Sequence, residues 1–257
     1  MHEQQPQGLR AFRPLREPVG AQPADGRERL RPFTAADNAD HGELWTPVVL
    51  SDDIVLEARV PSAYVARLQL ELSSINVGYR GFGELAKAGS CNIDVVCPEG
   101  DGWQDQIKSV GVISTGGSTF CTGFLVNNTA EDRKPYFMTA RHCGVTSSNA
   151  ASLVVYWNFQ SPTCGQQGGG SLSQYSTGSL FRSSNSASDF TLVELTQAPQ
   201  PAFDVVYAGW DRSNAVPTAA IAVHHPNTDE KSISFEDDPL QVTSYLGSTA
   251  PGDGTHL

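Results

Sequence analysis

Met138-Thr139-Ala140-Arg141-His142-Cys143 is the stretch that decides the fold. Small residues end an apolar run and present one histidine, which a cysteine follows directly. Forty-seven residues later, Asp189 opens the apolar run 190–195. A histidine followed by an aspartate matches the first two members of a catalytic triad whose serine comes last. The order predicts that His142 is a general base and that Asp189 orients it.

Each of these two residues also has an ordinary structural interpretation. A single histidine is more often a surface or buried structural residue, and an aspartate before a strand is often a turn residue. The surroundings favour catalysis, because His142 lies between Thr-Ala and Cys143 and a second cysteine, Cys121, precedes it in Cys121-Thr122-Gly123.

The serine of the triad is expected outside this sequence. In this order it follows the aspartate by about 90 residues, at roughly position 280, whereas the chain ends at Leu257. Of the serines after Asp189, only Ser248 has a glycine beside it, and none lies in a Gly-x-Ser-Gly setting. Such a setting frees backbone N–H groups for an oxyanion hole. We therefore expect the chain alone to be inactive.

Composition excludes several classes of partner. The net charge of -11 argues against nucleic acid, because phosphate binding needs clustered lysine and arginine. No apolar run reaches the roughly 20 residues that span a membrane, and no signal peptide is visible at the N-terminus. We expect a monomer with no cofactor.

Five cysteines indicate an oxidising compartment. No pair has Cys-x-x-Cys spacing, and His224-His225 has no cysteine nearby, so no metal site is expected. An odd count means either a free thiol or a partner that lies elsewhere.

Three regions differ in pattern. Residues 1–32 are polar and predicted to be disordered. Residues 33–87 form a second segment, in which alternation over 43–82 predicts two or three strands before a glycine-rich joint at 78–83. Residues 88–257 form an all-β body with a long polar loop at 161–188. Its expected strands are Ser109–Ser114, Thr119–Val126, Tyr136–Thr139, Ser152–Phe159, Phe190–Leu195, Val205–Gly209 and Ala219–His224.

Several motifs together carry a resemblance to a known family. They are Cys91-Asn92-Ile93-Asp94-Val95-Val96-Cys97-Pro98-Glu99-Gly100, Cys121-Thr122-Gly123 with Leu125-Val126-Asn127-Asn128-Thr129, the histidine motif, Val155-Tyr156-Trp157-Asn158 and His224-His225-Pro226-Asn227. From about Ser90 to Leu257 the sequence resembles the bacterial lysyl endopeptidases, which are secreted serine proteases of the chymotrypsin fold that cleave after lysine. The resemblance implies a chymotrypsin-like double β-barrel with an incomplete second barrel, after a partly β, propeptide-like segment 33–87.

The resemblance also implies roles for single residues. His142 and Asp189 become the base and its orienting carboxylate. The implied disulfides join Cys121 to Cys143 and Cys97 to Cys164. Cys91 is then unpaired here, because its family partner lies beyond Leu257. A further implied site is Tyr245, in place of an active-site tryptophan whose indole N–H it lacks. Lys87, which precedes Ala88 just after the glycine-rich joint, is either a processing site or an ordinary linker lysine.

We therefore expect a secreted, trypsin-like zymogen that cleaves polypeptide substrates after lysine once a serine beyond Leu257 completes the triad. The alternative is a non-catalytic, protease-like relic that acts only as a binding domain. The retention of both His142 and Asp189 favours the enzyme.

Overall fold

The structure is a computed structural model that describes residues 30–37, 40–49, 51, 54–76, 92–166, 168–213 and 215–241. Three candidate residues of the sequence analysis, Lys87, Cys91 and Tyr245, lie outside the described residues, as does the glycine-rich joint.

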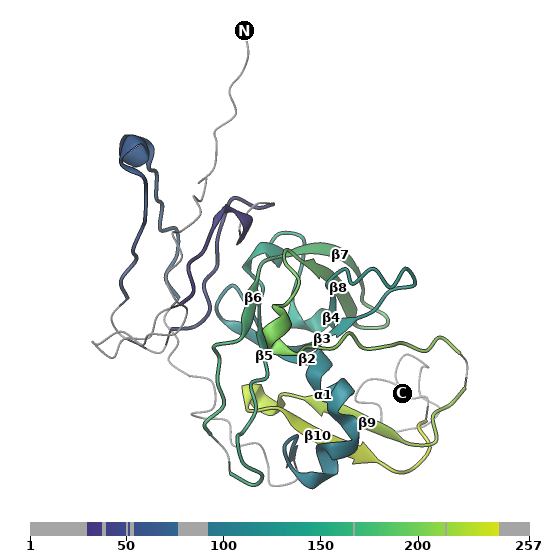
Figure 1. Cartoon of the computed structure of the whole chain (residues 1–257). Coiled ribbons are helices and arrows are strands. Elements are labelled where there is room, and N and C mark those ends of the chain that lie inside the picture. Colours follow the sequence, from purple (N-terminus) through teal and green to yellow (C-terminus); the bar gives the residue numbers. More distant parts are fainter. Residues whose placement is uncertain are drawn as a thin grey trace.

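The chain is mostly β, and its larger sheet curls into a half-barrel (Figure 1). All seven strands of this sheet are antiparallel, in the order β6-β5-β2-β3-β4-β8-β7. They are β2 (Val110–Thr115), β3 (Thr119–Val126), β4 (Tyr136–Ala140), β5 (Val154–Trp157), β6 (Tyr175–Thr177), β7 (Ser179–Asn185) and β8 (Phe190–Leu195).

A smaller sheet lies beside the first. It orders β1 (Ile93–Asp94), β10 (Ser232–Glu236) and β9 (Ala220–His224) as β1-β10-β9. Helix α1 (Gln104–Ser109) follows η3 (Pro98–Trp103), and its Ile107 packs with Val95 and Ile233. Short 3-10 turns complete the described residues: η1 (Ala35–Asp37), η2 (Ser62–Arg67), η4 (Arg141–Cys143), η5 (Ala150–Ser152), η6 (Pro201–Phe203) and η7 (Pro226–Thr228).

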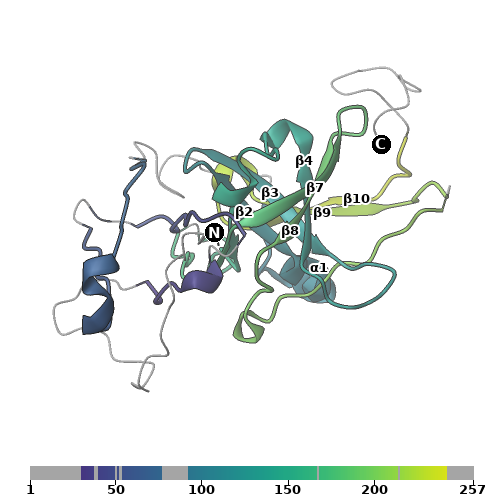
Figure 2. The same ribbon diagram turned by 90° about the horizontal axis from the view of Figure 1, so that it is seen from above.

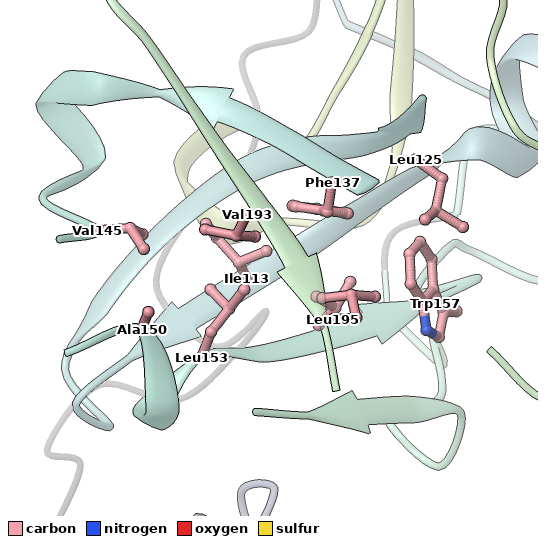
Figure 3. Close-up of a cluster of buried hydrophobic side chains, with 10 residues drawn as sticks. Ile113, Leu125, Phe137, Val145, Ala150, Leu153, Trp157, Val193 and Leu195 are labelled. Atoms are coloured by element: carbon pink, nitrogen blue, oxygen red, sulfur yellow. The ribbon is translucent and has the colours of Figure 1, made fainter. Parts of the chain in front are cut away.

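The main core fills the concave side of the larger sheet (Figure 3). Alternate residues of β8 point inward, so Val193 and Leu195 are buried while their neighbours are partly exposed. They pack with Phe137 and Trp157, whose rings meet edge to face at a centroid distance of 5.8 Å. This alternation is the expected pattern of a sheet with one buried face.

Three expectations about strands are wrong. The loop expected at 161–188 contains β6 and β7, which pair through backbone groups; β6 is buried, and the exposed second half of β7 is polar. Residues 205–209 form only one bridge, between Ala208 and Val126, because β2 and β4 already occupy both edges of β3. Within the described part of 30–76 there is no strand. Alternation of apolar and polar residues favours an extended backbone, but a strand forms only where a neighbouring segment pairs with it.

The N-terminal segment covers part of the larger sheet (Figures 1 and 2). Leu30, Phe33, Trp45 and Val48 pack against the buried cluster that includes Tyr156 of β5. The Val48 N–H also donates to the Tyr156 hydroxyl at 2.9 Å. Residues 54–76 lie farther out, with many apolar side chains exposed. Among the described helices, none has the length and apolar character to cross a membrane.

Candidate active site

His142 lies where β4 ends in the turn η4. Ala140 is still extended, and Gly144 closes the turn with a left-handed φ of 75°, which glycine adopts without strain. Gly123 of β3, which pairs with Thr139, lets this strand end approach closely: a Cβ there would stand 2.2 Å from the Phe137 ring. The small residues around the histidine therefore allow β3 and β4 to meet directly beneath it.

A disulfide fixes the turn that bears His142. It joins Cys121 of β3 to Cys143. A second disulfide joins Cys97 to Cys164, so both pairings that the resemblance implied are present in the structure. The sulfur atoms of Cys121 and Cys143 and a ring nitrogen of His142 lie within 4.8 Å of one another. The two sulfurs are bonded to each other, so neither is a thiolate available to a metal ion.

Asp189 stands beside His142 because β8 pairs with β4, with Phe190 opposite Ala140. The residue has a positive φ of 48° in the turn before β8. Its Oδ2 lies 2.6 Å from His142 Nδ1, and its Oδ1 accepts the His142 backbone N–H at 2.9 Å. Its own carbonyl accepts the Arg141 N–H at 2.9 Å. The aspartate thus binds both the ring and the backbone of the histidine turn.

The charge state of Asp189 follows from these contacts. Hydrogen bonds from the His142 ring and then from the His142 backbone N–H hold the pKa of the Asp189 carboxyl below its usual range. An ionised carboxylate only accepts, so the proton of a neutral His142 ring stays on Nδ1. The lone pair of Nε2 is then available to take a proton.

The dyad is open to solvent. The His142 side chain is 67% exposed and that of Asp189 is 30% exposed. Within the described residues, the ring of His142 bonds only to Asp189, and no serine hydroxyl bonds to it. The Nε2 face is therefore accessible to a nucleophile and a substrate.

A second group of buried polar residues was not assigned a role from sequence. Burial, and then the charge of Lys231, lower the pKa of His225 to about 3. Burial lowers the pKa of Lys231 to about 7, and its Nζ donates to the Ile107 carbonyl at 2.9 Å. The only sequence signal was the motif at 224–227, which does not show that its second histidine is buried.

The sequence region that carries His142 and Asp189 matches a known protein family. Residues 85–254, well over half of the chain, match the family described as the lysyl endopeptidase C-terminal domain. The chain belongs to this family. Both His142 and Asp189 and both disulfides fall inside the matched range.

The sequence identity between this chain and the proteins compared below is low. A lysyl endopeptidase of Pseudomonas aeruginosa is 29% identical over 233 residues, which cover 80% of this chain and 48% of the relative. The chain thus spans about half the length of this relative. Among solved structures, a mutant of Rv3671c from M. tuberculosis H37Rv in an inactive form matches with a TM-score of 0.31 and 12% identity, over 50% of this chain and 49% of that one. The Rv3671c protease in an inactive form matches with a TM-score of 0.33 and 12% identity, over 59% and 66%.

Proposed function

We propose that this chain carries the histidine and aspartate of a secreted serine endopeptidase that cleaves polypeptides after lysine. The observation that carries the proposal is the 2.6 Å contact between Asp189 Oδ2 and His142 Nδ1, which leaves Nε2 open, in a member of the lysyl endopeptidase family. The serine and the oxyanion donors would come from residues outside those described.

Each residue has one task in this reaction. Nε2 of His142 takes the proton of the serine hydroxyl as its oxygen bonds to the scissile carbonyl carbon. The carbonyl π electrons move onto the oxygen, and Asp189 stabilises the imidazolium that forms. When the C–N bond breaks, the proton passes from Nε2 to the leaving amine. A water then repeats the sequence on the acyl-enzyme and regenerates the serine.

The proposal extends to the fold and the life cycle of the protein. The half-barrel sheet would be the first barrel of a chymotrypsin-like fold, and β1, β9 and β10 would belong to the second. Two disulfides suit an oxidising, extracellular compartment. Residues 33–87 would be a propeptide removed by cleavage after Lys87, and the mature enzyme would be a monomer.

The proposal is tested with the 257-residue chain and with the product of the whole reading frame that contains it. Both are treated with a serine-directed fluorophosphonate and with peptides that contain one lysine or one arginine. We expect the longer product to be labelled and to cleave after lysine, with His142→Ala abolishing both activities, and the shorter chain to do neither. Labelling of the shorter chain would place the nucleophile within it. A longer product that binds peptides without labelling or cleavage would indicate the non-catalytic alternative.

A further inference from the structure

Thr122 connects the histidine turn to the smaller sheet. It lies on β3 directly after Cys121, whose disulfide reaches Cys143. Its carbonyl oxygen accepts the hydroxyl of Thr139, three residues before His142, at 2.7 Å. The residue pair 121–122 therefore holds the histidine turn on both sides, by a covalent bond after His142 and by a hydrogen bond before it.

The side chain of Thr122 contacts the turn between β9 and β10. Its hydroxyl oxygen accepts the backbone N–H of His225 at 3.0 Å. Both η4 and η7 contact β3, so this strand lies between the catalytic turn and the turn that follows His225. The Thr122 hydroxyl is thus the polar link between His225 and the strand that holds His142.

His225 is a fixed anchor for this link. Its side chain stacks on Phe159, with ring centroids 6.0 Å apart and planes at 16°. Its Nδ1–H donates to the Asp229 carbonyl at 2.9 Å, and the residue is 6% exposed. Because burial and the charge of Lys231 lower its pKa to about 3, the ring stays neutral at neutral pH. The anchor therefore keeps one hydrogen-bonding pattern under working conditions.

The turn after His225 needs such support. Asn227 and Thr228 both have positive φ, 51° and 65°. For a β-branched residue such as Thr228 this backbone conformation is a genuine outlier, which persists only where surrounding contacts impose it. Two such contacts are the packing of η7 on β3 and the hydrogen bond from the His225 N–H to the Thr122 hydroxyl.

We propose that Thr122 is a positioning residue for His142, through which the turn 225–229 sets the orientation of the catalytic ring. Loss of the hydroxyl would leave the His225 N–H without its acceptor and let the strained turn relax. The shift would reach His142 through the Cys121–Cys143 disulfide and through Thr139. The proposal rests on the proposed function only in giving this ring a catalytic task, since the contacts themselves do not depend on it.

The test uses the 257-residue chain labelled with ¹⁵N-histidine, at pH 9. Two-bond ¹H–¹⁵N spectra show which ring nitrogen carries the proton, and His142→Ala identifies the signal. We expect the wild-type ring to hold the proton on Nδ1, bonded to Asp189. Thr122→Val should end the dominance of this tautomer, and Thr122→Ser, which keeps the hydroxyl, should restore it.

Thr191→Val is the matched control. Thr191 pairs with Thr139 across β4 and β8, and its buried hydroxyl has no partner within the described residues. This variant removes a hydroxyl of the same kind without breaking a hydrogen bond, so it should keep the wild-type spectrum. Wild-type ¹⁵N shifts for His142 in Thr122→Val, or an equal disturbance in Thr191→Val, would overturn the proposal.

If the valine variant does not fold by circular dichroism, Thr122→Ala is measured in its place and interpreted in the same way. The measurement needs no hydrolysis. A product of the whole reading frame without peptidase activity would therefore disprove the proposed function and leave this result standing.

Discussion

Replacement of the buried Lys231 by methionine should stabilise the protein at neutral and mildly acidic pH. Lys231 is 0% exposed, and the described residues give its Nζ one hydrogen bond, to the Ile107 carbonyl. Burial lowers its pKa from the usual 10.5 to about 7. At about 1.4 kcal/mol per pKa unit, keeping this lysine charged costs on the order of 5 kcal/mol below pH 7. Loss of the hydrogen bond would offset about 1 kcal/mol of the gain.

The sign of the pH dependence follows from the direction of this shift. Between pH 7 and 10.5 the lysine is protonated in the unfolded chain and neutral in the folded one. The unfolded chain then binds more protons, so the free energy of unfolding rises with pH, by up to about 1.4 kcal/mol per pH unit. The variant lacks the group and should lack this rise.

Urea unfolding measured by tryptophan fluorescence between pH 6.5 and 9.5 tests this prediction, with the buried Trp157 as a reporter. The upper limit avoids the titration of Tyr156, whose pKa burial raises above its usual 10.0. Lys108→Met is the control, because Lys108 lies on the same side of the molecule in α1 but on the surface, paired with Asp204 at 2.6 Å. The control should keep the rise with pH. A Lys231→Met variant that is no more stable than wild type at pH 6.5, or that keeps the rise, would refute the reasoning.

Three further outcomes are expected. His142→Ala should raise the pKa of Asp189 toward 3.8, because it removes the hydrogen bond of the ring, the largest cause of the lowering, although the backbone N–H of residue 142 still donates to Asp189; a ¹³C carboxyl titration that shows the same pKa as in the wild type would contradict this. The stability that the lowered pKa confers is present above the unfolded pKa and lost as pH falls through the folded value. Replacing Cys121 and Cys143 together by alanine should cost about 3 kcal/mol of unfolding free energy, given their separation of 22 residues, and an unchanged urea midpoint would argue against the bond. Gly123→Ala should cost roughly 3 kcal/mol by overpacking, since its Cβ would lie 2.2 Å from a buried ring; calorimetry that shows an unchanged melting temperature would exclude that clash.

Local pattern was enough to predict the strands that carry the dyad. β8, which follows Asp189, has the expected bounds and alternates buried and partly exposed positions. β4, which ends before His142, alternates in the same way and extends one residue past its expected end. The order of His142 and Asp189 indicated a pair 47 residues apart, and the structure places them in hydrogen-bond contact. The disulfide partners came from the resemblance, since spacing alone allows several pairings among five cysteines.

Contacts between segments far apart in sequence were decided only by the tertiary structure. β6 and β7 look like loop because they are rich in polar residues, and they form strands because they pair through backbone groups, which every residue has. Residues 54–76 look like strands and form none within the described residues, because no described neighbour pairs with them. The link from Thr122 to His225 spans 103 residues and uses a backbone N–H. Side-chain chemistry can be read residue by residue, whereas a backbone partner is chosen by how the whole chain packs.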